Sequence, residues 1–314
     1  MRRQPIRVHT KKNGSAGLVG FAFLGLSLVF VCVAGKLIAG PEDLATWEGY
    51  PSAARIQQRQ ISSPYAILYD CTDNEILFSE SADEQAYPAS LTKIMTTIVA
   101  LENIRDLHGK ATIQPEVCEN LRKANASVAG FLPNETVTVQ DLLYGTMLPS
   151  GADAAITLAQ VIAGSEKQFV DMMNQKAQEL GMRNTVFQNC TGLHQQGHVS
   201  TARDMMKLLQ YAWEQKTFRK IFTAQTYTVR STQKHPSGLT ISSTLFDQLD
   251  TAVSDGIQIL GGKTGYTEQA GLCLASAAEK DGKEYLLVTM GAPGDHTTPP
   301  YHINDAIFIY QNIT

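Results

Sequence analysis

The sequence predicts an α/β fold of the α+β type, in which helices flank an antiparallel sheet and a mostly helical subdomain is inserted. Strand-like runs stand at both ends of residues 63–314, and helical periodicity dominates from about residue 110 to 225. The simplest packing covers the sheet with helices and sets the inserted part beside it. A junction of this kind forms a cleft.

Two strands and a helix are predicted at the start of this region. Residues 65–69 and 75–78 are rich in β-branched and aromatic residues, and the polar residues 70–74 between them indicate a hairpin. A helix with apolar periodicity then begins near Ser90 and continues to Leu101.

Helices are predicted through the middle of the chain. Thr138 and Asp141 have the spacing of a capping box and open a short helix that reaches Met147. Residues 153–162 and 166–180 are helical by period, and Gly181 ends the second of these helices. Ser200 is expected to cap a further helix that runs through Leu209.

Strands return in the last third of the chain. They are predicted at residues 226–229, 240–242, 271–278 and 284–290, and a helix over residues 303–310 follows them.

The N-terminal residues predict a membrane anchor. Residues 16–35 carry no charge, and a helix of this length can cross a bilayer. The charged residues before them are all Arg or Lys. We therefore expect a cytoplasmic basic tail (1–15), a signal-anchor (16–38), a spacer (39–62) and an extracytoplasmic catalytic domain (63–314) on a single-pass cell-membrane protein. A cleaved signal peptide is the competing interpretation, although its apolar region is normally shorter.

Charge and cysteine content exclude some protein classes. Five of the 26 basic residues precede the anchor, so the rest of the chain carries 21 basic and 30 acidic residues, a net charge of −9. This balance offers no broad surface for nucleic acid. Cys71, Cys118, Cys190 and Cys273 are scattered singly, and buried free thiols are favoured over a disulfide framework, although export permits disulfides.

The segment around Ser90 and Lys93 has the spacing of a nucleophile and its base. Residues three apart on a helix lie on one face, so these two side chains can meet. A serine hydroxyl needs a proton acceptor to attack, and a lysine serves only if desolvation or a nearby cation lowers its pKa. Alone, Ser-x-x-Lys is weak, because a helix N-cap followed by a solvated lysine has the same pattern.

Two further motifs support this interpretation of Ser90 and Lys93. Ser150 precedes a predicted helix, where it can be the N-cap, a proton relay beside Lys93, or both. Lys263 and Thr264 precede Gly265, and on a strand their cation and hydroxyl suit a substrate carboxylate, while the glycine allows close approach of the substrate backbone. The order of the three motifs matches the active-site set of penicillin-binding proteins and class A β-lactamases.

Other motifs have weaker support. A P-loop needs a glycine where the chain has Ile257, and strand signals follow Gly265 where a P-loop would open a helix. His194 and His198 are four apart, as in half of a metal site, but the nearby Gly192 and Gly197 favour a loop.

Residues 63–314 resemble the serine D-alanyl-D-alanine carboxypeptidases, which are low-molecular-weight penicillin-binding proteins with a β-lactamase/transpeptidase-like fold. The resemblance includes the three motifs and residues 65–70, 188–193, 200–205 and 261–267. It implies that Ser90 attacks the D-Ala-D-Ala bond of a peptidoglycan stem peptide, with Lys93 as base and Ser150 as proton relay.

The resemblance also implies the remaining roles. Lys263 and Thr264 would hold the terminal carboxylate, while backbone N–H groups of Ser90 and Tyr266 would form the oxyanion hole. No metal or cofactor is implied, and β-lactams are expected to acylate Ser90 as inhibitors.

One departure concerns position 152, where the family usually has Asn and this chain has Ala152. A lost hydrogen bond of this kind costs about 1 to 3 kcal/mol unless another group replaces it. Restoring Asn is therefore expected to raise turnover without weakening the fold. A β-lactamase or transpeptidase on the same fold, and a catalytically weak β-lactam sensor or wall-binding protein, are the alternatives to a carboxypeptidase.

Overall fold

The structure is a computed structural model that describes residues 60–249 and 256–313. The predicted basic tail, signal-anchor and most of the spacer lie outside these residues. Across the two described ranges, no helix is both long enough and apolar enough to cross a membrane.

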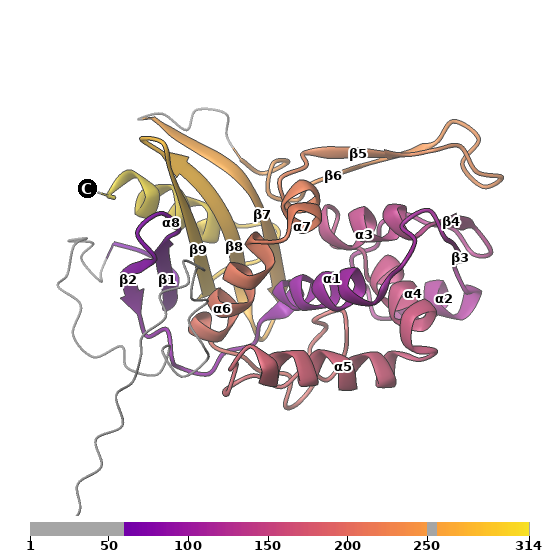
Figure 1. Cartoon of the computed structure of the whole chain (residues 1–314), viewed down its shortest axis with the longest axis horizontal. Coiled ribbons are helices and arrows are strands. Elements are labelled where there is room, and N and C mark those ends of the chain that lie inside the picture. The colour runs from indigo at the N-terminus through magenta and orange to yellow at the C-terminus, as the bar shows by residue number, and fades with distance from the viewer. Residues whose placement is uncertain (1–59, 250–255, 314) are drawn as a thin grey trace, which may run out of the picture. The chain divides into compact units, whose positions relative to one another are not determined.

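An antiparallel sheet of five strands forms one part of the fold (Figure 1). Its order is β2 (Glu75–Glu80), β1 (Tyr65–Asp70), β9 (Lys283–Ala292), β8 (Gly271–Lys280) and β7 (Ile257–Thr267). The predicted hairpin over residues 70–74 joins β1 to β2, and the Lys263 motif lies on a strand, as expected. The N-terminal and C-terminal strands therefore meet in one sheet.

Both faces of this sheet are buried, and alternate residues of a strand point to opposite faces. In β1, Ala66 and Leu68 pack in the core on the side of α8 (Tyr301–Gln311), whereas Ile67 packs in the larger core shared with the other helices. The helix α6 (Ala202–Trp213) covers this second face against β9 and β1. Helices therefore flank the sheet, as the sequence predicts.

The central helix α1 (Thr92–Asn103) joins the sheet to the helical part (Figure 1). Its residues Ile94, Met95 and Ile98 are fully buried. The helical part contains α2 (Pro115–Lys123), α3 (Val139–Met147), α4 (Ala152–Ala163), α5 (Glu166–Glu179) and α7 (Lys216–Phe222). The helices at α3, α4 and α5 were predicted, whereas α2 and α7 were not.

Helix caps show where local prediction succeeds and where it fails. Thr138 and Asp141 form the predicted capping box, with N···O distances of 3.0 and 2.8 Å. The predicted cap of α6 is wrong by one residue, because Thr201 and not Ser200 accepts the Asp204 N–H. Ser200 instead exchanges both backbone hydrogen bonds with Ala86, which holds it in extended conformation.

Two small sheets of two strands each complete the fold. One pairs β3 (Lys110–Thr112) with β4 (Thr136–Thr138), which lies beyond α2 in the chain and which the sequence did not predict. The other is a hairpin of β5 (Thr226–Val229) and β6 (Leu239–Ser242). The four cysteines in the described ranges are free thiols, as favoured from the sequence.

Candidate active site

Ser90 lies in a single 3₁₀ turn, η1 (Ala89–Leu91), directly before α1. Ala89 has a positive φ of 46°, a conformation that costs a non-glycine residue energy and is often found at functional sites. Gly192 and Gly265 both pack against this turn. A Cβ on Gly192 would lie 1.9 Å from the Ala89 carbonyl oxygen, and one on Gly265 would lie 3.0 Å from the Ser90 nitrogen. The two glycines therefore allow two segments to approach the backbone at Ser90.

Lys93 meets Ser90 across the first turn of the helix, as the spacing predicts. Its Nζ lies 3.0 Å from Ser90 Oγ and 2.5 Å from the Thr191 carbonyl oxygen. The side chain is buried, and burial lowers the pKa of Lys93 to about 8, although the charges of Cys190 and Asp153 raise it. An amine with this pKa is partly neutral near neutral pH and can accept a proton.

A loop formed by residues 189–193 positions the Thr191 carbonyl. The side-chain oxygen of Asn189 accepts hydrogen bonds from Thr191 N, Thr191 Oγ1 and Gly192 N at 3.2, 3.0 and 2.8 Å. Asparagine commonly builds such turns with backbone groups two or three residues later. The sequence carried that signal, but nothing in it indicated that Lys93 would be the partner of the loop.

Ser150 reaches the same cleft from the segment between α3 and α4. It has a positive φ of 63°, and Gly151, not Ser150, is the N-cap of α4, so the capping interpretation is wrong. The hydroxyl oxygen is buried and has no hydrogen-bond partner among the described residues. A buried hydroxyl without a partner costs free energy, which a bound substrate can recover.

A cleft of about 440 Å³ brings most of the predicted site residues together. Its lining includes Ser90, Ser150, Thr264, Gly265 and Tyr266. These residues come from η1, the α3–α4 connection and β7, so the cleft lies where the sheet meets the helical part, as predicted.

Lys263 does not line this cleft. Its side chain is fully buried, and its Nζ donates to the Thr264 carbonyl oxygen at 2.6 Å. Burial and the nearby charge of Lys93 hold the pKa of Lys263 well below its usual value. In this structure the group exposed to a ligand is therefore the Thr264 hydroxyl.

Thr244 is a cleft residue that the sequence analysis missed. It follows β6, and its Oγ1 lies 2.6 Å from Thr264 Oγ1. Two hydroxyls side by side can both donate to one carboxylate. No local pattern marks Thr244, because its partner lies twenty residues away on another strand.

Ala152 is buried against Val117 and Leu121 and does not line the cleft. The group that faces the cleft beside it is Ser127, whose carbonyl oxygen accepts the Ala152 N–H at 2.8 Å. An asparagine at position 152 would add an amide to this apolar cluster. The environment of Ala152 therefore argues against the expected gain in turnover.

Asp153 holds the segment that carries Ser127. Its buried carboxylate accepts the N–H groups of Ala129 and Phe131 at 2.7 and 3.2 Å. Burial raises the pKa of Asp153, while these backbone hydrogen bonds lower it.

His194 and His198 have different surroundings. His198 is buried, its Nδ1 accepts the Gln188 N–H, and its Nε2 lies 2.8 Å from Thr92 Oγ1 at the start of α1. Burial lowers the pKa of His198 to about 4, so the ring is neutral near neutral pH. His194 packs edge-on against Tyr87. No group of three or more metal-binding side chains occurs within residues 60–249 and 256–313.

Comparison with known proteins finds relatives of this chain. A relative in Bacillus subtilis, D-alanyl-D-alanine carboxypeptidase DacF, is 32% identical over 228 residues, which cover 72% of this chain and 57% of that protein. The D-alanyl-D-alanine carboxypeptidase of Streptomyces sp. K15 is 34% identical over 217 residues, covering 67% of this chain and 74% of the relative. This chain thus spans less than two thirds of the Bacillus relative.

Comparison with solved structures also finds a protein of similar fold. The Streptomyces K15 DD-transpeptidase has a TM-score of 0.73 at 29% identity, with 82% of this chain and 98% of that chain covered. The family model for D-alanyl-D-alanine carboxypeptidases, peptidase family S11, matches residues 52–294, which contain all three motifs. With its motifs assembled in one cleft and most of its length matched, this chain belongs to the D-alanyl-D-alanine carboxypeptidase family.

Proposed function

We propose that this protein is a serine D-alanyl-D-alanine carboxypeptidase that removes the terminal D-Ala from peptidoglycan stem pentapeptides through an acyl-enzyme on Ser90. The observation that carries the proposal is the contact of 3.0 Å between Ser90 Oγ and the buried amine of Lys93, whose pKa is lowered to about 8. Membership of the family supports the choice of substrate.

In the acylation step, neutral Lys93 accepts the hydroxyl proton as Ser90 Oγ attacks the carbonyl carbon of the penultimate D-Ala. The backbone N–H groups of Ser90 and Tyr266 donate to the oxygen that becomes negative, as preorganised donors do in an oxyanion hole. The Thr191 carbonyl oxygen keeps the Lys93 amine in place throughout.

Departure of the terminal D-Ala requires a proton on its nitrogen. Ser150 is suited to relay that proton from Lys93, because the residue lines the cleft and its buried hydroxyl has no competing partner among the described residues. The hydroxyls of Thr264 and Thr244 are suited to bind the terminal carboxylate. Lys263 helps to position Thr264 by donating a hydrogen bond to its carbonyl oxygen.

Water then attacks the ester on Ser90, with Lys93 again accepting a proton, and releases the shortened peptide. A β-lactam would acylate Ser90 in the same way, because its reactive amide and its carboxylate resemble those of the D-Ala-D-Ala dipeptide. β-Lactams are therefore expected to act as inhibitors of this protein.

The test is release of free D-Ala from a soluble pentapeptide that ends in D-Ala-D-Ala. The full-length chain in detergent should release D-Ala, and Ser90→Ala and Lys93→Ala should each lose almost all of this activity. A well-folded chain that releases no D-Ala would refute the carboxypeptidase, and covalent labelling by penicillin would then separate a β-lactam sensor from an inert site.

A transpeptidase is the second candidate, because the similar Streptomyces K15 structures are of a DD-transpeptidase. The two reactions share the acyl-enzyme and differ in whether water or an amine attacks it. Adding an amine acceptor to the same assay separates them. A transpeptidase forms the new peptide bond in preference to hydrolysis, whereas a carboxypeptidase continues to release the free tetrapeptide.

We further propose that residues 16–38 are an uncleaved signal-anchor, so that the catalytic domain lies outside the cell membrane. The uncharged run of residues 16–35 and the five basic residues before it support this proposal. Cell fractionation and N-terminal sequencing test it: a soluble protein lacking residues 1–40 would show that the segment is a cleaved signal peptide.

A further inference from the structure

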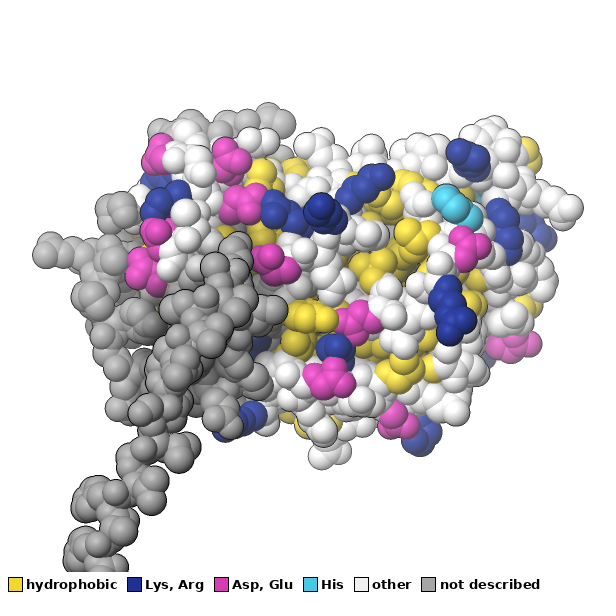
Figure 2. All heavy atoms as spheres, viewed as in Figure 1, with side chains coloured by type: hydrophobic (Ala, Val, Ile, Leu, Met, Phe, Trp, Pro, Cys, Tyr) yellow, Lys and Arg dark blue, Asp and Glu magenta, His cyan; other side chains and the backbone are white. Residues whose placement is uncertain are grey.

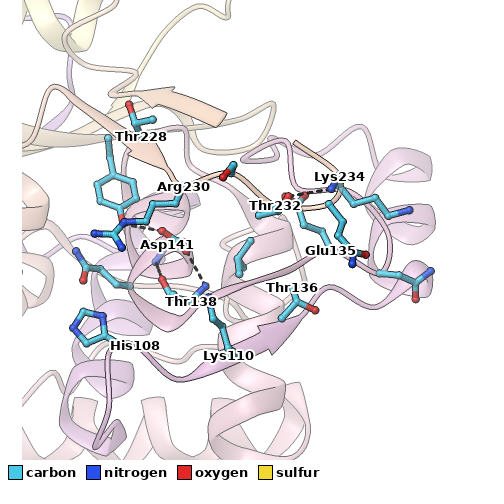
Figure 3. Close-up of a pocket in the computed structure, with 16 residues that line it drawn as sticks. His108, Lys110, Glu135, Thr136, Thr138, Asp141, Thr228, Arg230, Thr232 and Lys234 are labelled. Atoms are coloured by element: carbon cyan, nitrogen blue, oxygen red, sulfur yellow. Dashed lines mark hydrogen bonds between the residues drawn. The ribbon is translucent and has the colours of Figure 1, made fainter. Parts of the chain in front are cut away.

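A second concave site lies apart from the cleft. It is a groove of about 810 Å³ between the paired strands β3 and β4 and the outer half of the β5–β6 hairpin (Figure 3). The residues that line the groove and those that line the cleft do not overlap. The groove is therefore not an extension of the site around Ser90.

Two buried carboxylates build the floor of this groove. Glu135 is 1% exposed and accepts hydrogen bonds from Thr232 Oγ1 at 2.6 Å and His235 Nδ1 at 2.8 Å. Asp141 is 6% exposed and accepts the Tyr227 hydroxyl at 2.7 Å. These contacts fix the β5–β6 hairpin to the helical part, and they leave neither carboxylate facing the groove without a partner.

The rim of the groove carries positive charge. Lys110, Arg230 and Lys234 are exposed, and no hydrogen bond or ion pair joins their side-chain charges to another described residue. They are spread along the groove, with His108 at one end (Figure 3). Figure 2 shows Lys and Arg side chains around a histidine at this end of the described molecule. With Glu135 and Asp141 in the floor, the lining has three cations and two carboxylates, a net charge of +1, whereas the whole chain has a net charge of −4.

Many of the other lining residues carry hydroxyls or amides, including Asn134, Thr136, Gln140 and Thr228. Cations that are spread along a groove match a linear ligand with repeated negative charges, because each cation can meet a different repeat unit. Hydroxyl and amide side chains between them match ligand hydroxyls. We propose that the groove binds an anionic polymer whose repeat units carry hydroxyl groups, such as an acidic glycan or a polyol phosphate.

Nucleic acid fits the same groove less well. Single-stranded nucleic acid is held by bases that stack on free aromatic faces. Two aromatic rings line the groove, and that of Tyr227 already stacks on Tyr144 with centroids 3.9 Å apart and uses its hydroxyl on Asp141. The exposed ring of His108 is a single platform at one end, not a series along the groove. Phosphate and hydroxyl contacts are therefore favoured over base contacts.

The test is direct titration of the full-length chain in detergent with two probes, poly(glycerol phosphate) and uncrosslinked peptidoglycan strands with free stem-peptide carboxylates. The triple variant Lys110→Glu, Arg230→Glu, Lys234→Glu should bind at least one probe about tenfold or more weakly than the unaltered chain. The control variant Lys167→Glu, Lys216→Glu, Lys220→Glu replaces exposed lysines elsewhere and changes the net charge equally. It should keep most of the binding.

Binding should also weaken as salt is added, because exposed charges are screened over about 8 to 10 Å at physiological ionic strength. The probe that binds distinguishes phosphate from carboxylate as the recognised group. Equal losses in the two triple variants, no binding to either probe, or equal binding of a DNA oligomer would each overturn the proposal.

Catalysis gives an independent control. The groove variant should release D-Ala from a short soluble pentapeptide as the unaltered chain does, since such a substrate cannot span both sites. Binding needs no turnover, so a chain that fails to release D-Ala leaves the groove test intact.

Discussion

Asp153 is the position where one substitution should change both the stability of the fold and the pH dependence of the active site. Its carboxylate accepts the buried N–H groups of Ala129 and Phe131 and so holds the segment with Ser127 against the cleft. Its negative charge also raises the pKa of Lys93. Asp153→Asn keeps the size of the side chain while removing the charge and one acceptor oxygen.

The magnitude follows from the number of hydrogen bonds lost. In Asp153→Asn one buried N–H loses its acceptor, which costs about 1 to 3 kcal/mol. Asp153→Ala loses two bonds to a charged group, at about 1.5 to 3 kcal/mol each. At roughly 2 to 4 °C per kcal/mol for a domain of this size, Asp153→Asn should lower the Tm by about 2 to 12 °C, and Asp153→Ala by more.

Urea unfolding and thermal melts followed by circular dichroism measure these changes, with the exposed Asp171→Asn as control. The control should stay within about 0.5 kcal/mol of the unaltered chain. In Asp153→Asn the pKa of Lys93 should fall further, so the acidic limb of the β-lactam acylation rate should move to lower pH. Unchanged stability together with an unchanged limb would refute this account of Asp153.

The remaining predictions concern the nucleophile and its surroundings. Because the pKa of Lys93 is about 8 and the neutral amine is the base, acylation of Ser90 by a β-lactam should rise from pH 6, reach half of its maximum near pH 8 and level off about one pH unit higher; a rate independent of pH would contradict this role. Gly192→Ala should destabilise the fold by about 2 kcal/mol or more and slow acylation at least about tenfold, because its Cβ would overlap the Ala89 carbonyl oxygen at a positive φ. Gly181→Ala is the matched control, with a positive φ but no atom within 4 Å, and should leave acylation unchanged. Ala152→Asn should lower the free energy of unfolding by about 1 to 3 kcal/mol without raising D-Ala release, and faster release from an equally stable variant would restore the expectation from sequence.

Local sequence patterns predicted much of the fold. The hairpin of β1 and β2, the capping box of α3 and the strand that carries Lys263 all depend on residues close together in the chain. The patterns failed where tertiary contacts override them. Ser200 has a good capping side chain, yet a backbone pairing with Ala86 makes Thr201 the cap.

The contact between Ser90 and Lys93 is the part of the site that the sequence determined by itself, because residues three positions apart lie on one face of a helical turn. Only the tertiary structure decided the surroundings that give this pair its chemistry. The carbonyl that holds Lys93 comes from Thr191, ninety-eight residues away. The apolar packing that lowers the pKa of Lys93 likewise comes from several distant segments, and no local pattern specifies which of them will meet.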